Sequence, residues 1–135
     1  MADKIRKVDY CYVSVPDKPG EGVRVLRALR EHGVSLLSLT AFPSSAGTAQ
    51  FDLVVGSGDL EKAAANANLK LSEKKQAFYI TGADRAGAAA EILGKLADAK
   101  INVTATNAAC GQSGFGMILW VKPKDFDAAA KALGV

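Results

Sequence analysis

The chain has 135 residues, of which 49% are hydrophobic and 23% are charged, and its net charge is +3. This balance is typical of a soluble globular protein and excludes a disordered chain. The seventeen lysines and arginines are spread along the chain, so nucleic-acid binding gains little support from charge. No apolar run approaches the roughly 18–20 residues of a membrane span, and the polar start MADKIRK predicts no signal peptide. We therefore expect a cytoplasmic protein without a membrane partner.

The first half of the chain predicts a strand, a helix, a hairpin and a second helix. Polar and apolar residues alternate from Tyr10 to Val15, as in a half-buried strand. Val23, Leu26 and Leu29 then recur at helical spacing, and Asp59 is a suitable N-cap for the later helix. The expected elements in chain order are a strand at 10–15, a helix at 20–32, strands at 34–42 and 49–56, a helix at 59–68 and a short edge strand at 69–71.

The second half predicts the same order of elements. An apolar stripe at helical spacing predicts a helix, and its members are Ala89, Ile92, Leu93, Leu96 and Ala97. The glycine-rich segment CGQSGFG joins two predicted strands, so we expect a hairpin loop and not a phosphate-binding loop, which would open a helix. The expected elements are a strand at 76–82, a helix at 87–99, strands at 101–108 and 117–121, and a final helix at 125–134.

Matching residues show that the chain contains an internal repeat. At one constant spacing, Asp17, Gly20, Leu26 and Leu29 recur as Asp84, Gly87, Leu93 and Leu96. A repeat this long indicates a duplicated structural unit, with boundaries at 1–72 and 73–135. Each helix needs a sheet on which to bury its apolar stripe. We therefore expect an α+β fold: a ferredoxin-like βαββαβ sandwich in which two tandem repeats form one continuous antiparallel sheet with helices on one face.

The opposite face of the predicted sheet is unusually apolar. If Val13 and Ile80 face the helices, alternation turns another set away from them: Tyr12, Tyr79, Val54, Ile118 and Trp120. These residues are either scattered surface hydrophobes or a face that a second sheet covers. We favour the second interpretation, with the cover supplied by another copy of the chain, and so expect a homodimer formed through this open sheet face.

The sequence contains no recognisable catalytic set. Its single histidine, His32, ends the first predicted helix, where we expect a surface or capping role. Cys11 and Cys110 lack metal-ligand spacing, and we expect both to be buried, reduced thiols. These residues predict neither an enzyme nor a metal or cofactor site.

The junctions DKPG and DRAG, each between a strand and a helix, are the candidate binding sites. The free N–H groups at a helix start favour a carboxylate. Asp17 and Asp84 lie just before these starts. Each aspartate has two possible interpretations. It only caps its helix or shapes its turn, or in addition it binds the ammonium group of a ligand. A site that holds both charges would bind an amino acid.

The segment VPDKPGEGVRVLRALREHGVSLLSLTAF resembles the opening of an ACT domain, a ligand-sensing module of amino-acid metabolism, and DRAGAAAEILGKLADAKINV fits the same pattern. The resemblance extends from about Val8 to Val135 and is similar in particular to the regulatory ACT pair of aspartate kinases. It implies an allosteric regulatory or sensor protein that binds a small molecule, most simply an amino acid, at the interface of its two repeats. It also implies a partner enzyme of amino-acid metabolism.

The resemblance also implies two pseudo-equivalent ligand sites. The first consists of the Asp17 side chain and the backbone of Lys18, Gly20 and Gly22, closed by Ile101 and Asn102. The second consists of Asp84, Arg85 and Gly87, closed by Val34 and Ser35.

Three positions depart from the family pattern. Ala86 replaces the proline of the second loop, and Ser35 stands where the second copy has Asn102. Ala41 stands where aspartate kinases use a glutamine, so Thr40 would have to substitute for it. We therefore favour the first site, leave the occupancy of the second open, and do not assume that the ligand is lysine or threonine.

Two alternatives remain open. The chain could be a structural dimerisation module without a ligand. It could also resemble RNA-recognition modules, which stack bases on aromatic residues of an open sheet, here Tyr12, Tyr79 and Trp120. The absence of an RNP1-type pattern and the mild charge disfavour nucleic acid as a partner.

Overall fold

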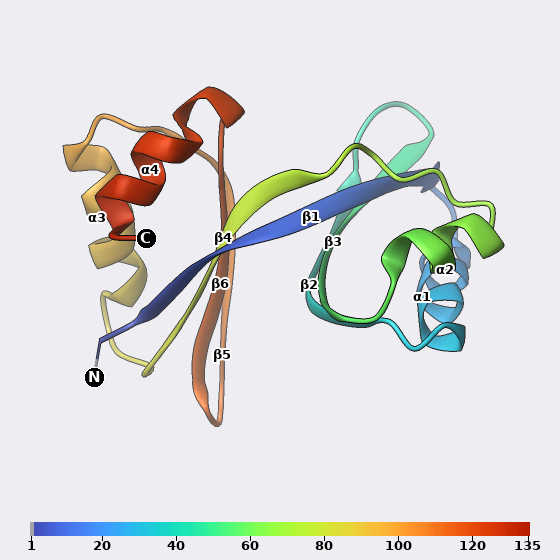
Figure 1. The fold of residues 1–135 in the computed structure, drawn as a ribbon, viewed down its shortest axis with the longest axis horizontal. Coiled ribbons are helices and arrows are strands. Elements are labelled where there is room, and N and C mark those ends of the chain that lie inside the picture. The colour runs from blue at the N-terminus through green and yellow to red at the C-terminus, as the bar shows by residue number, and fades with distance from the viewer. Residues whose placement is uncertain (1) are drawn as a thin grey trace. The chain divides into compact units, whose positions relative to one another are not determined.

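The computed structural model describes residues 2–135, which form six strands, four α-helices and one short 3-10 helix (Figure 1). In chain order these are β1 (Lys4–Pro16), α1 (Glu21–Glu31), β2 (Ser35–Pro43), β3 (Thr48–Ser57), α2 (Leu60–Asn66), β4 (Lys75–Gly82), α3 (Ala88–Asp98), β5 (Val103–Gly111), β6 (Gly114–Val121), η1 (Pro123–Asp125) and α4 (Phe126–Leu133). The predicted α+β class is therefore confirmed. No helix of residues 2–135 has the length and apolar character of a membrane span.

The chain divides into two compact units. We call Asp9–Lys75 the first unit, and residues up to Val8 together with Gln76–Val135 the second unit. The strand β1 begins in the second unit and ends in the first. The repeat boundaries 1–72 and 73–135 describe the duplicated sequence and stay a prediction. The compact units differ from them at the N-terminus, because Asp3 pairs there with Arg85 of the second unit.

In the first unit the strands are ordered β2-β3-β1, and both pairings are antiparallel. Helices α1 and α2 pack on one face of this sheet (Figure 1). The core between them contains Val13 and Leu53 from the sheet and Val25, Leu29 and Ala63 from the helices. Burying a side chain of the size of valine or leucine contributes about 1.5–3 kcal/mol, so this layer supplies most of the stability of the unit.

In the second unit the strands are ordered β4-β6-β5, again with antiparallel pairings. Helices α3 and α4 cover one face of this sheet (Figure 1). Phe78 of β4 stacks on Phe126 of α4 with ring centroids 4.5 Å apart. Ile92 and Leu96 of α3 complete the core. Each unit thus contains a strand, a helix, a hairpin and a second helix in that order, as the sequence predicts.

Several local predictions need correction. Val23 does not belong to the buried stripe of α1, because its side chain is 51% exposed. The buried residues are Val25, Ala28 and Leu29, which share one face at spacings of three and four residues. Likewise α3 buries Ala88, Ile92 and Leu96 and exposes Ala89 and Ala97.

One predicted loop and one predicted strand are shorter in the structure. The hairpin between β5 and β6 pairs Gly111 with Gly114, so only Gln112 and Ser113 form its turn. Gly114 has φ +121°, a conformation that favours glycine. The edge strand expected at 69–71 is a single bridge between Leu71 and Val13.

Three of the five residues expected on the face opposite the helices are buried. Val54, Ile118 and Trp120 are 1%, 3% and 6% exposed. They are therefore not scattered surface hydrophobes. Tyr12 and Tyr79 are half-buried, and the cations of Lys75 and Arg6 lie over their rings. The homodimer through this face stays a prediction.

Candidate ligand-binding loops

The first candidate loop joins β1 to α1. Asp17 is exposed, and its backbone N–H donates to the carbonyl of Gly47 at 3.0 Å. The N-cap of α1 is Gly20, with φ +94°, and no side chain caps this helix. Asp17 therefore does not act as a helix cap, because the chain turns through a left-handed glycine instead. Asp17 precedes by three residues a helix start that no side chain caps.

The surroundings of the first loop hold its backbone close to the core. A Cβ added at Gly22 would lie 3.2 Å from the Phe51 ring, so a larger residue there would require the ring to shift. Glu21 pairs with Arg24 at 2.7 Å in the first turn of α1. The Lys18 carbonyl accepts from the Glu21 N–H at 3.4 Å, which closes the DKPG turn. These contacts fix the path of the backbone that the sequence analysis assigned to the ligand.

The second candidate loop joins β4 to α3 and has the same backbone plan. Its N-cap is Gly87, with φ +85°, again without a capping side chain. Asp84 does not cap α3, because its Oδ1 accepts a hydrogen bond from the Cys110 Sγ at 3.2 Å. Both aspartates therefore lie before glycine-started helices. Neither Asp17 nor Asp84 caps the helix that follows it.

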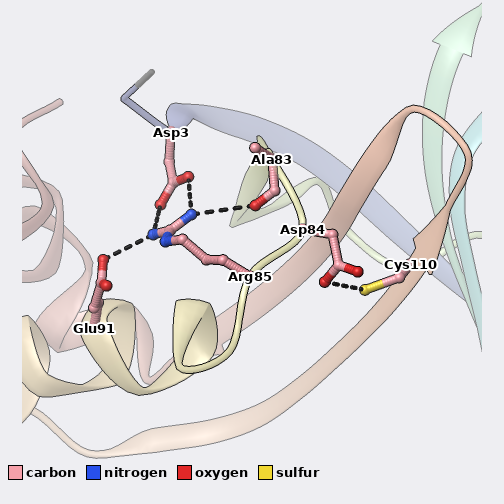
Figure 2. Close-up of polar contacts among 6 residues, drawn as sticks. All are labelled: Asp3, Ala83, Asp84, Arg85, Glu91 and Cys110. Carbon is pink, nitrogen blue, oxygen red and sulfur yellow. Dashed lines mark hydrogen bonds and ion pairs between the residues drawn. The ribbon is translucent and has the colours of Figure 1, made fainter.

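Arg85 differs from its counterpart Lys18 in having several fixed partners (Figure 2). Its two Nη atoms donate to the two carboxylate oxygens of Asp3, each at 3.0 Å. One Nη atom also donates to the Ala83 carbonyl at 3.3 Å, and the other pairs with Glu91 at 2.7 Å. The hydrogen bonds from Arg85 lower the pKa of the Asp3 carboxyl and that of Glu91. Both groups are therefore held in the charged form.

Gly82 makes room for the Asp3 carboxylate beside the end of β4. A Cβ placed at Gly82 would overlap Asp3 Oδ1 and would also lie 2.8 Å from the Phe115 ring. The carboxylate therefore lies against the bare backbone of the strand end. The Asp3 side chain is 13% exposed, whereas that of Arg85 is 33% exposed. Asp3 is a site residue that sequence reasoning missed, because no local pattern connects it with the loop.

Cys110 lies at the β5–β6 hairpin and contacts the second loop through Asp84. The expectation that it is buried is wrong, because it is exposed, whereas Cys11 is buried as expected. The hydrogen bond to Asp84 raises the pKa of the Cys110 thiol. A protonated thiol donates to the carboxylate, while a thiolate would repel it. The side chain of Asp84 is thereby oriented toward the hairpin (Figure 2).

The remaining predicted site residues lie at or just before β2 and β5, because these strands begin at Ser35 and Val103 and not at residues 34 and 101 as predicted. Val34 is buried, and Ser35 is exposed at the start of β2. Ile101 packs against the core of the second unit, and its N–H donates to the Leu96 carbonyl at 2.9 Å, while Asn102 is exposed. Each predicted site joins residues of both units, and both sites stay predictions.

Thr40 lies beside a buried carboxylate that the sequence analysis did not identify. It is paired across the strands with Asp52, which is 7% exposed and accepts from the Gln50 Nε2 at 2.9 Å. Burial raises the pKa of Asp52. Among the described atoms the Thr40 hydroxyl is buried and has no hydrogen-bond partner. The alternation of β3 gave no signal for Asp52, because a polar residue is ordinary on the face away from the helices.

Metal and histidine chemistry find no support in the described part of the chain. Residues 2–135 contain no group of three or more His, Cys, Asp or Glu side chains that could hold a metal ion. His32 has the capping role predicted for it. Its Nδ1 donates to the Ala28 carbonyl at 3.0 Å, and its Nε2 lies 3.1 Å from Asn66 Nδ2.

No protein-family model matches the sequence, and no curated protein sequence matches it. Solved structures match it in fold. Protein BT0572 from Bacteroides thetaiotaomicron has a TM-score of 0.82 and 15% identity, over 96% of this chain and 88% of that one. The ligand-free regulatory subunit of aspartate kinase from Thermus thermophilus has a TM-score of 0.67 and 14% identity, over 98% and 94%.

The complete aspartate kinase of Clostridium acetobutylicum has a TM-score of 0.58 and 18% identity, over 96% of this chain and 33% of the enzyme. At these identities the likeness concerns the fold alone. The fold expected from the ACT resemblance is thereby confirmed. This fold is shared with regulatory parts of aspartate kinases.

Proposed function

We propose that this protein is a non-catalytic regulatory module that binds a small amino-acid ligand at the loop between β1 and α1. The observation that carries the proposal is the open start of α1, where Gly20 supplies no capping side chain and Asp17 stays exposed. A helix start attracts a ligand carboxylate, and an aspartate attracts an ammonium group. Together these groups have the charge pattern that a zwitterion requires.

The fold neighbours support the regulatory part of the proposal. Two of them are a regulatory subunit of aspartate kinase and a complete aspartate kinase. In this proposal the two units are a tandem pair of ACT-like repeats. We also propose that Ile101 and Asn102 contact the ligand, as the resemblance implies. We further propose that the protein forms a homodimer.

Regulation follows from differential affinity. A ligand shifts a conformational or assembly equilibrium only if it binds one state more tightly than another. A module without a catalytic set therefore acts through a partner, and we propose an enzyme of amino-acid metabolism in a reducing cytoplasm. The proposal specifies the carboxylate and ammonium groups of the ligand. It does not specify the ligand's side chain, and so does not assume lysine or threonine.

A thermal-shift screen against the twenty amino acids tests the proposal. Saturation at 100 times the Kd adds about 2.7 kcal/mol of stability, which gives a clear rise in Tm. The rise should be lost in Asp17→Ala and kept in Asp9→Ala, which removes an exposed carboxylate from β1, the strand that precedes Asp17. A folded protein with no response to any amino acid would contradict the proposal and favour the dimerisation module.

Burial of Trp120 argues against the RNA-binding alternative. Stacking needs an exposed aromatic face, but Trp120 is 6% exposed. The rings of Tyr12 and Tyr79 are half-buried beneath Lys75 and Arg6, at 5.8 and 5.2 Å. None of the three residues offers the open platform that this alternative requires.

A further inference from the structure

The loop between β4 and α3 holds a carboxylate that belongs to the chain itself. We propose that this loop is a carboxylate-binding site, and that Asp3 occupies it as a tethered internal ligand which the carboxylate of a small molecule can displace. The inference extends the proposed function to the second loop and rests on it for the nature of the natural ligand. The carboxylate site itself is defined by its own contacts.

The guanidinium of Arg85 is arranged to recognise a carboxylate. Both Nη atoms donate to Asp3, each at 3.0 Å, in the two-point geometry that matches a planar guanidinium to a carboxylate. The Ala83 carbonyl and Glu91 hold the same two nitrogen atoms from other directions. These contacts do not involve Asp3, so they would keep the guanidinium in place if the Asp3 carboxylate left (Figure 2).

The backbone beside Arg85 leaves space for carboxylate oxygens. A side chain at Gly82 would occupy the position of Asp3 Oδ1. An ordinary strand end does not need glycine, since Gly82 lacks the positive φ that would favour this residue for backbone reasons. The requirement comes from the close approach of the carboxylate. Gly82 and Arg85 thus form a receptor of which Asp3 is the occupant.

The occupied contact opens onto a groove of about 610 Å³, a size in the range of small-molecule pockets. Asp3, Arg85, Glu91, Lys95 and Val135 are among the residues that line it. Lys95 is a second cation at the site and helps to lower the pKa of the Asp3 carboxyl. A ligand with one carboxylate on Arg85 would thus have room for further polar groups.

The two loops differ in the residue that follows the aspartate. The first loop has Lys18, whose ammonium is a compact point charge. The second has Arg85, whose planar guanidinium can donate to both oxygens of a carboxylate. Asp3 and Asp17 flank β1 at its two ends. An occupant that displaces Asp3 therefore releases the start of the strand whose other end leads into the first loop. This covalent connection gives the second loop a means to influence the first.

Displacement predicts a definite change in affinity. The apparent Kd of a ligand equals its intrinsic Kd divided by the fraction of open sites. If the open state has the population of a usual minor state, about 0.1–10%, removal of the Asp3 charge should tighten carboxylate binding by about 10–1,000-fold.

Acetate at constant ionic strength is the probe, with chloride as the balancing anion. Binding is followed by NMR through the backbone N–H signal of Gly82, which lies beside the carboxylate and is present in every variant. We expect Asp3→Asn to bind acetate at least about tenfold more tightly than the natural chain. The matched control Asp9→Asn, which neutralises an exposed carboxylate within β1, should behave like the natural chain. The double variant Asp3→Asn/Arg85→Gln should lose the effect.

A second readout covers the case in which Asp3→Asn disturbs the fold. In the natural chain, saturating acetate should speed backbone hydrogen exchange at Ile5, the second residue of β1 and two positions after Asp3. Equal acetate affinity in the natural chain and in a folded Asp3→Asn would overturn the proposal, and so would unchanged exchange at Ile5. Acetate binding together with a flat amino-acid screen would leave the carboxylate site standing and remove the proposed function instead.

Discussion

Arg85 binds both carboxylate oxygens of Asp3 at 3.0 Å, although the two residues lie 82 positions apart in the sequence. Glu91 joins the same guanidinium at 2.7 Å, so one cation connects the N-terminal segment, the loop after β4 and the first turn of α3. The pair is partly exposed, and such pairs contribute modestly to stability. Its position beside Gly82 is the basis of the proposed carboxylate site.

The Asp3–Arg85–Glu91 cluster predicts a pH dependence of stability. The pKa of Asp3 and that of Glu91 are lowered in the fold. Their stabilisation is therefore present above their unfolded pKa values, about 3.9 and 4.3, and is lost as pH falls below them. Arg85→Gln should unfold at lower denaturant concentration than the natural chain at pH 7, with the difference shrinking toward pH 3. Urea titrations across this range measure it; a pH-independent difference would contradict the prediction.

Gly82→Ala should destabilise the second unit. Its methyl group overlaps Asp3 Oδ1 and approaches the Phe115 ring. Overpacking of this kind costs about 1–3 kcal/mol. Gly94→Ala is the matched control: no atom lies within 4 Å of the added methyl in α3, so this variant should gain about 0.5–1 kcal/mol. Thermal unfolding of both variants tests the contrast, and equal Tm values would refute it.

Asp52→Asn should raise the stability at neutral pH. Burial raises the pKa of Asp52, so the folded chain favours the protonated carboxyl. Its stability contribution is present at low pH and is lost as pH rises through the folded pKa. The amide of Asn has no charge to bury, and its oxygen can still accept from Gln50. The Tm gain over the natural chain should be larger at pH 7 than at pH 3. A loss of Tm at pH 7 would instead show that the charge is needed.

Cys110 should be the thiol that reacts in the native protein. It is exposed and Cys11 is buried, so iodoacetamide should modify one thiol before unfolding and two after it. The hydrogen bond to Asp84 raises the pKa of Cys110 and slows the reaction near neutral pH. Asp84→Asn should shift the rate profile to lower pH. Mass spectrometry identifies the modified residue, and an unchanged profile would exclude the influence of Asp84.

Local signals in the sequence predicted the elements well. The Asp59 side chain caps α2 by accepting from the Lys62 N–H at 3.0 Å, as its residue type and position predicted. The strand–loop–helix junctions after β1 and β4 were also predicted, because turn residues and helical periodicity act over a few neighbouring positions. The phase of α1 was less predictable. Val23 and Val25 are both apolar, and only packing against the sheet decides which of them is buried.

The candidate sites show where local reasoning ends. Both aspartates lie where the sequence placed them, but the left-handed Gly20 and Gly87 replace them as N-caps. Trp120, expected on the face away from the helices, is 6% exposed. Sequence alternation predicts that a side chain faces away from the helices, but not what covers it.

The sequence by itself determined the order of strands and helices, the repeat, and the pair of aspartate-containing loops, because periodicity and turn chemistry are properties of short segments. Only the tertiary structure decided that Asp3 lies on Arg85 and that Cys110 donates to Asp84. Each of these contacts joins residues from separate elements. Their meeting depends on strand pairing and packing across the sheet, and no short segment of sequence contains that information.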